Sequence, residues 1–143
     1  MDAVVVSPYA YWQRDTMMQK VRAGVVGVGQ MGQYHVGVYS ELFNVELVSV
    51  ADCDEDRVTA IAEKYKTIPV TDYHELLGAV DVVSIAVPTS RHYRIARDFL
   101  EAGVHVLLEK PMTHTLEEAR ELFRLAEARN VVLHVGHVER FNG

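Results

Sequence analysis

Apolar and polar positions follow one another along this chain in blocks that favour a regular succession of strands and helices. Short, nearly continuous apolar runs predict strands at residues 21–28, 45–52, 67–70, 81–88, 104–109 and 131–138. Segments with helical spacing of apolar side chains predict helices at residues 30–43, 54–66, 71–78, 90–103 and 113–130. Strands that are apolar on both faces and separated by helices indicate a parallel sheet covered on both sides. The predicted fold class is α/β, a doubly wound parallel sheet in three layers, αβα.

Local signals mark several helix ends. Thr115 and Glu118 have the spacing of a capping box, and so do Asp72 and Glu75. The helix predicted at residues 90–103 ends at Gly103, a glycine that suits the position just past the last helical residue.

The composition indicates an ordinary globular domain. The chain has 143 residues, 49% hydrophobic and 24% charged, which predicts one domain at residues 20–143 after an N-terminal extension at residues 1–19. The net charge of −6 argues against a nucleic-acid or membrane partner. No apolar run approaches the ~20 residues of a membrane span, and no basic segment precedes AVVV, as a signal peptide requires. The single cysteine, Cys53, fits a cytoplasmic location.

A glycine-rich loop supplies the first candidate chemistry. GVGQMG has the pattern G-x-G-x-x-G, which is weak alone but here follows a predicted strand and opens a predicted helix. Such glycines permit a tight turn, close approach of a pyrophosphate and close helix packing, as in a Rossmann-type fold. The alternative is a mere tight turn. The candidate cofactor-binding residues of this loop are Gly27, Val28, Gly29, Gln30, Met31 and Gly32.

Asp52 lies at the end of the second predicted strand, twenty positions beyond Gly32. An acid there accepts hydrogen bonds from the ribose hydroxyls and repels a 2′-phosphate. No arginine follows before Arg57, so the sequence favours NAD, with NADP less favoured; Cys53 is a further candidate contact. Asp52 is alternatively a helix N-cap, although Asp54 suits that role better. S-adenosylmethionine in the glycine loop of a methyltransferase is another alternative, but it leaves the charged run Glu109-Lys110-Pro111, at the end of a later strand, unexplained. The pattern calls for no metal.

The loop after the fourth long strand is predicted to lie near the nicotinamide. Val87, Pro88 and Thr89 are the candidate contacts, with Pro88 ending the strand and Thr89 or Ser90 capping the next helix. His92 is a candidate ligand contact or, equally, an ordinary residue of the first helical turn.

Glu109-Lys110-Pro111 breaks the apolar pattern where a strand leaves the core. A surface lysine is usually a solvated charge, but Lys110 falls at the edge where the cofactor should end. Pro111 fixes the turn and Glu109 offers Lys110 a partner. A lysine whose pKa is lowered by partial desolvation can exchange a proton near neutral pH. Lys110 is therefore the candidate catalytic residue.

Five stretches together resemble the glucose-fructose oxidoreductase / inositol dehydrogenase (Gfo/Idh/MocA) family: GVVGVGQMGQYH, VSVADCDEDR, VSIAVPT, HVLLEKPMT and VGHVERFN. The resemblance implies an N-terminal Rossmann domain that binds NAD(P) and an oxidoreductase acting on CH–OH groups of sugars, cyclitols or nucleotide sugars. It implies cofactor binding by the three glycines and Asp52, and a nicotinamide-side loop at Pro88 and Thr89. It places Glu109 and Lys110 at the reaction centre, with Lys110 relaying the proton.

The ending GHVERFN is similar to members acting on UDP-N-acetylhexosamines, in which His137 and Arg140 would face the cleft between domains. Family members carry a second, substrate-binding domain that usually forms the oligomer interface, and this sequence stops where that domain should begin. The first hypothesis is the cofactor domain of an enzyme that is a homo-oligomer in its full-length form. The second is a stand-alone NAD-binding or regulatory module without catalysis by itself.

Overall fold

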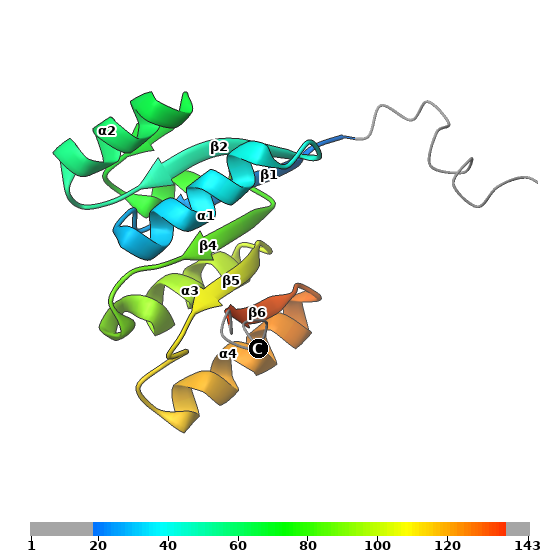
Figure 1. The fold of residues 1–143 in the computed structure, drawn as a ribbon. Coiled ribbons are helices and arrows are strands. Elements are labelled where there is room, and N and C mark those ends of the chain that lie inside the picture. The colour runs from blue at the N-terminus through cyan, green and yellow to red at the C-terminus, as the bar shows by residue number, and fades with distance from the viewer. Residues whose placement is uncertain (1–18, 137–143) are drawn as a thin grey trace, which may run out of the picture.

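A parallel six-stranded sheet forms the centre of the computed structural model, which describes residues 19–136. Its strand order is β3-β2-β1-β4-β5-β6, and every neighbouring pair is parallel (Figure 1). This is the order of a doubly wound nucleotide-binding sheet, with its switch point between β1 and β4. The strands are β1 (Val21–Val26), β2 (Val45–Ala51), β3 (Ile68–Val70), β4 (Val82–Ile85), β5 (His105–Glu109) and β6 (Leu133–Gly136).

Helices cover both faces of the sheet. The α-helices are α1 (Gln30–Glu41), α2 (Glu55–Tyr65), α3 (His92–Glu101) and α4 (Leu116–Arg129). Two short 3₁₀ helices, η2 (Tyr73–Leu76) and η3 (Thr89–Arg91), lie before β4 and before α3. The predicted three-layer αβα fold is therefore confirmed for the described residues.

Alternation along the strands gives the sheet two apolar faces. Val25 and Val50 pack with Val36 of α1 and Val58 of α2 in one core. The opposite face packs against α3 and α4 in a second, larger core, whose main side chains are Val83, Ile85, Phe99, Leu100, Leu108 and Leu122. Because both faces are buried, side chains at the strand ends are held from two layers.

The prediction of a helix at residues 71–78 is wrong in helix type and length. This segment contains only the short 3₁₀ helix η2. Asp72 accepts a hydrogen bond from the backbone N–H of His74, two residues on, instead of forming a capping box with Glu75. The connection from β3 to β4 is a packed turn, in which Leu76 is buried.

Pro88 does not end β4, which stops three residues earlier at Ile85. The neighbouring strand β1 turns away at Gly27. The hydrogen bond from Ala86 N to Val26 O (2.8 Å) is therefore the last one that pairs β4 with β1. The predicted capping by Thr89 or Ser90 is also absent: Pro88 precedes η3, and α3 begins without a side-chain cap.

The other end signals are confirmed. Thr115 Oγ1 accepts from Glu118 N (3.2 Å), and Glu118 Oε2 accepts from Thr115 N (3.4 Å), which completes a capping box on α4. Gly103 has a φ of 77° directly after the last residues of α3. Asp54 caps α2 by accepting from Arg57 N at 3.0 Å. These contacts place the strand and helix ends that build the site.

Replacing Thr115 by Ala should lower the free energy of unfolding by about 1 kcal/mol, because the Glu118 N–H loses its acceptor. Urea denaturation followed by circular dichroism measures this loss. Thr59→Ala, in the exposed interior of α2, is the matched control and should cost nothing, since alanine is the better helix former. Equal losses in the two variants would contradict the capping role.

Candidate functional site

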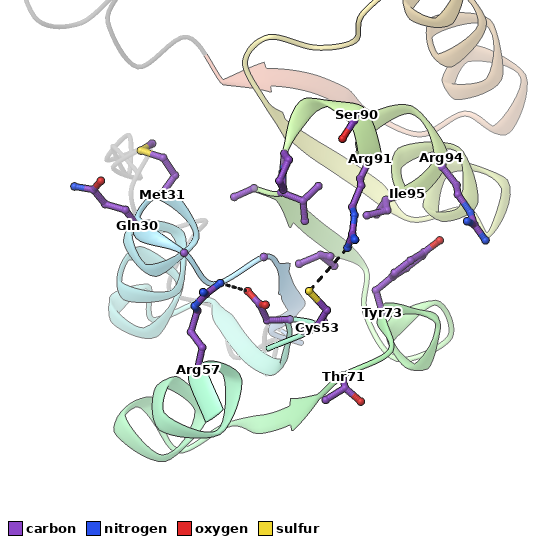
Figure 2. Close-up of a pocket in the computed structure, with 18 residues that line it drawn as sticks. Gln30, Met31, Cys53, Arg57, Thr71, Tyr73, Ser90, Arg91, Arg94 and Ile95 are labelled. Atoms are coloured by element: carbon purple, nitrogen blue, oxygen red, sulfur yellow. Dashed lines mark hydrogen bonds and ion pairs between the residues drawn. The ribbon is translucent and has the colours of Figure 1, made fainter. Parts of the chain in front are cut away.

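A pocket of about 1130 Å³ opens at the carboxyl ends of β1, β2 and β4 (Figure 2). This volume is slightly above the usual range for small-molecule sites, ~300–1,000 Å³. The pocket lies at the switch point of the sheet, where doubly wound folds bind their ligands. Eight of the residues predicted to bind cofactor line it: Gly27, Gly29, Gln30, Met31, Asp52, Cys53, Val87 and Pro88.

The three glycines of the loop have different structural roles. Gly27 has a φ of 87°, and a Cβ there would lie 2.5 Å from the Ala86 carbonyl oxygen. A Cβ on Gly32 would overlap the carbonyl oxygen of Gly27, so the start of α1 packs directly on the end of β1. A Cβ on Gly29 would meet no atom within 4 Å. Gly29 is thus the glycine that the fold itself does not require.

The start of α1 fits the pyrophosphate of a dinucleotide. Gly29 is its N-cap and provides no side-chain cap, so the amides of the first turn lack a side-chain acceptor. Gln30 and Met31 line the pocket at this end. Uncapped amides, the positive end of the helix dipole and open space above Gly29 together form a cradle for an anion.

Asp52 connects β2 to the glycine loop. Its carboxylate is only 7% exposed. Oδ2 accepts from Val28 N (2.9 Å) and Oδ1 accepts from Asp54 N (2.9 Å). The acid is therefore fixed by backbone N–H groups at the pocket wall, where it can still accept hydrogen bonds from ribose hydroxyls.

Arg57 contacts this acid, and Arg91 contacts the next residue, Cys53. Arg57 Nη1 lies 3.5 Å from Asp52 Oδ2, and Arg57 Nη2 lies 3.1 Å from Asp54 Oδ2. Figure 2 shows Arg57 and Arg91 extending toward the pocket from opposite sides, with Arg91 Nη1 3.9 Å from Cys53 Sγ. Cations at a pocket wall suit a ligand that carries phosphate groups, although the chain as a whole is acidic.

Several lining residues were missed by the sequence reasoning, namely Thr71, Tyr73, Ser90, Arg91, Arg94 and Ile95. Thr71 and Tyr73 come from the turn after β3, which the wrong helix prediction concealed. Burial, and then the hydrogen bond to Asp98, raise the pKa of Tyr73 to about 12, so its hydroxyl stays protonated and donates at 2.6 Å. The arginines could have been predicted from the run SRHYRIAR, because it places positively charged side chains directly after the predicted nicotinamide-side loop.

His92 does not line the pocket. It is 1% exposed, and its ring lies between backbone carbonyl groups. Nε2 is 2.8 Å from Val87 O, while Nδ1 is 2.9 Å from Pro111 O and 3.2 Å from Met112 O. Of the two alternatives for His92, the structure favours the ordinary residue of the first helical turn, which lies behind the two loops that flank the site. Val28 and Gly32 are likewise buried and absent from the pocket lining.

Lys110 follows β5, the strand next to β4, and its side chain is exposed. The partial desolvation expected for Lys110 is therefore not provided by residues 19–136. The Lys110–Pro111 peptide bond is cis. Glu109 is buried, and its Oε1 lies 2.6 Å from Nε2 of His35, a residue of α1 that the sequence reasoning missed. His137 and Arg140 lie outside the described residues.

Comparison with known proteins identifies the domain. The model of the "Oxidoreductase family, NAD-binding Rossmann fold" (Gfo/Idh/MocA) matches residues 21–137. The chain belongs to the Gfo/Idh/MocA oxidoreductase family. The resemblance drawn from the five sequence stretches is thereby confirmed.

One Gfo/Idh/MocA relative is the UDP-N-acetylglucosamine 3-dehydrogenase of Acidithiobacillus ferrooxidans, 38% identical over 123 residues, which make up 86% of this chain and 39% of the relative. Its solved structure superposes with a TM-score of 0.82 over 85% of this chain and 40% of that one. This relative agrees with the hint from GHVERFN. The chain spans about two fifths of the length of such relatives.

Two other solved structures carry different cofactors. GenD2 from gentamicin A biosynthesis, in complex with NAD, is 35% identical, with a TM-score of 0.80 over 82% of this chain and 34% of that one. Biliverdin reductase from Synechocystis sp. PCC 6803, in complex with biliverdin and NADP⁺, is 32% identical, with a TM-score of 0.80 over 83% of this chain and 38% of that one.

The described residues contain no helix long and apolar enough to cross a membrane.

The glycine loop can be tested with two matched variants. Gly29→Ala should keep the melting temperature and weaken NAD binding at least about tenfold, or ~1.4 kcal/mol, because the new methyl group occupies the space left open for the ligand. Gly32→Ala should lower the melting temperature strongly, because its Cβ overlaps the Gly27 carbonyl oxygen. Calorimetric titration and thermal denaturation measure the two effects. Unchanged NAD affinity in a folded Gly29→Ala protein would disprove the cradle.

Proposed function

We propose that this chain is the NAD-binding domain of a dehydrogenase that transfers hydride between nicotinamide and a hydroxyl-bearing carbon of a sugar, cyclitol or nucleotide sugar. The observation that carries the proposal is the open, uncapped start of α1 beside the fixed carboxylate of Asp52. Both features suit a ribose and a pyrophosphate. Lys110 follows β5, which only β4 separates from β1 in the sheet. The UDP-N-acetylglucosamine 3-dehydrogenase relative supports nucleotide sugars as the first substrates to test.

Each residue then has a defined task. The amides at Gly29, Gln30 and Met31 bind the pyrophosphate, and Asp52 orients the adenosine ribose. Val87 and Pro88 line the pocket at the end of β4 and bound the nicotinamide. The bound nicotinamide supplies a two-electron hydride acceptor or donor.

Lys110 is the proton relay in this proposal. When the substrate hydroxyl is oxidised, its oxygen loses a proton, and the Lys110 amine accepts it. In the reverse direction Lys110 returns that proton to the carbonyl oxygen. The exposed position of Lys110 leaves room for a second domain, which would exclude water, bind the substrate and form the homo-oligomer interface. We place this enzyme in the cytoplasm.

A stand-alone NAD-binding module is the second candidate. It is favoured by the observation that described residues of this chain line a pocket large enough for a small-molecule ligand. The two candidates differ in turnover: the module binds NAD without reducing it, whereas the enzyme, joined to its second domain, reduces NAD in the presence of a sugar substrate.

We expect this chain to bind NAD in the micromolar range and NADP at least about tenfold more weakly, because the Asp52 carboxylate repels a 2′-phosphate. Isothermal titration with the two dinucleotides measures the ratio. Arg57→Ala should weaken NADP binding further and leave NAD binding nearly unchanged, since Arg57 is the cation closest to Asp52 in the structure. Tighter binding of NADP than of NAD by the unmodified chain would overturn the assignment.

Lys110→Ala in the full-length protein should lower kcat at least about a hundredfold, in line with loss of a general acid–base group, and leave the Kd for NAD within about threefold of its original value. Stopped-flow NADH absorbance with a panel of sugars and nucleotide sugars measures kcat. Lys64→Ala, which removes an exposed lysine of α2, is the control. Unchanged turnover in Lys110→Ala would remove Lys110 from the mechanism.

A further inference from the structure

The residues on either side of Lys110 are held by two histidines that come from opposite layers of the fold. His35 belongs to α1 and contacts the side chain of Glu109. His92 belongs to α3 and contacts the backbone of Pro111 and Met112. α1 and α3 cover different faces of the sheet (Figure 1). The two contacts therefore fix the segment Glu109–Met112 from both sides.

On the α1 side, four side chains form a continuous chain of hydrogen bonds. Tyr39 Oη lies 2.7 Å from Ser84 Oγ, Ser84 Oγ lies 3.3 Å from His35 Nδ1, and His35 Nε2 lies 2.6 Å from Glu109 Oε1. Burial raises the pKa of Tyr39, so its hydroxyl remains a donor. One direction satisfies every group: Tyr39 donates to Ser84, Ser84 to His35, and His35 to the Glu109 carboxylate.

The hydrogen-bonded series includes a serine, a histidine and a carboxylate, but it is not a nucleophilic catalytic site. Ser84 is 0% exposed and lies inside β4, so no substrate carbonyl can reach its hydroxyl. Ser84 and Glu109 face α1 because side chains alternate along a strand, while Ile85 and Leu108 face the larger core. The series therefore holds Glu109 in place.

On the α3 side, the ring of His92 connects both loops of the candidate reaction centre. Nε2 faces the carbonyl of Val87, and Nδ1 faces the carbonyls of Pro111 and Met112. A neutral ring donates from only one of these nitrogens, and we assign that N–H to Nδ1 because it faces two acceptors. The ring is 1% exposed, so water cannot replace these contacts. His92 thus sets the spacing between the loop after β4, which lines the pocket, and the loop that carries Lys110.

We propose that His35 and His92 are positioning residues, a two-sided clamp that fixes the backbone on either side of Lys110 relative to the nicotinamide-side loop. The role in catalysis rests on the proposed function, whereas the clamp itself is a property of this chain. A proton relay gains from such a clamp because small displacements of a reacting group cost large factors in rate.

Backbone ¹⁵N relaxation of the 143-residue chain tests the clamp without any turnover. Pro111 has no N–H, so the amides of Lys110 and Met112 are the probes. We expect order parameters near ~0.85 in the unmodified chain and below ~0.6 for Lys110 in His35→Leu and for Met112 in His92→Leu. His114→Leu, at an exposed histidine four residues past Lys110, should leave both amides rigid. Rigid amides in the two folded clamp variants would overturn the proposal.

Conservative variants keep the test decisive if a leucine variant does not fold. The amide of Asn approximates the position of the histidine Nδ1, and the longer Gln approximates Nε2. His35→Gln should therefore retain the bond to Glu109 and a rigid Lys110 amide, whereas His35→Asn should lose both. His92→Asn should retain the donor to the Pro111 carbonyl and keep Met112 more rigid than His92→Gln does. The reverse order in either pair would contradict the clamp.

The full-length protein separates this inference from the proposed function. If both hold, His35→Asn and His92→Gln lower kcat about tenfold or more and leave KM and the Kd for NAD nearly unchanged. If the proposed function fails, the unmodified protein shows no turnover while the order parameters still respond. If the clamp fails, turnover is present and the order parameters do not change.

Discussion

The close contact between Gly32 and the carbonyl of Gly27 is the constraint on which the rest of the structure depends. It lets α1 start directly on the end of β1, which leaves the first amides of α1 uncapped and facing the pocket. The same turn brings Val28 N–H to Asp52 and ends the pairing of β1 with β4. The uncapped start of α1, the fixed Asp52 carboxylate and the free end of β4 therefore share one origin, the absence of Cβ atoms at Gly27 and Gly32.

A second layer of organisation lies beneath the pocket. Apolar side chains fill both faces of the sheet, but at β4 and β5 the side facing α1 carries Ser84 and Glu109 instead. A buried carboxylate needs a donor, and His35 provides it. The hydrogen-bonded side chains thus replace some apolar packing next to Lys110, the proposed catalytic residue. Departures from an ideal apolar core are expected near functional sites.

The fold and the pocket were predictable to different extents from the sequence. The strand and helix order followed from apolar periodicity, and the glycine loop with Asp52 located the pocket because their spacing reflects one local motif. The turn after β3 was mistaken for a helix, since the helical spacing of a few residues does not distinguish one turn from several. His35, Ser84 and Tyr39 were not found because their contacts join α1 to β4 and β5, and side-chain pairing across layers leaves no periodic signal.

The hydrogen bonds of Asp52 have a consequence for changing the cofactor preference of this domain. A direct route toward NADP would replace the acid with a small neutral residue. Here the carboxylate is also the acceptor for two backbone N–H groups, one in the glycine loop and one at the start of α2. An alanine would leave both donors without that acceptor and loosen the loop that is proposed to bind the pyrophosphate of either dinucleotide. In the proposed function, cofactor selectivity and the order of the loop are thus coupled through the Asp52 side chain, and a redesign would have to supply a neutral acceptor at this position.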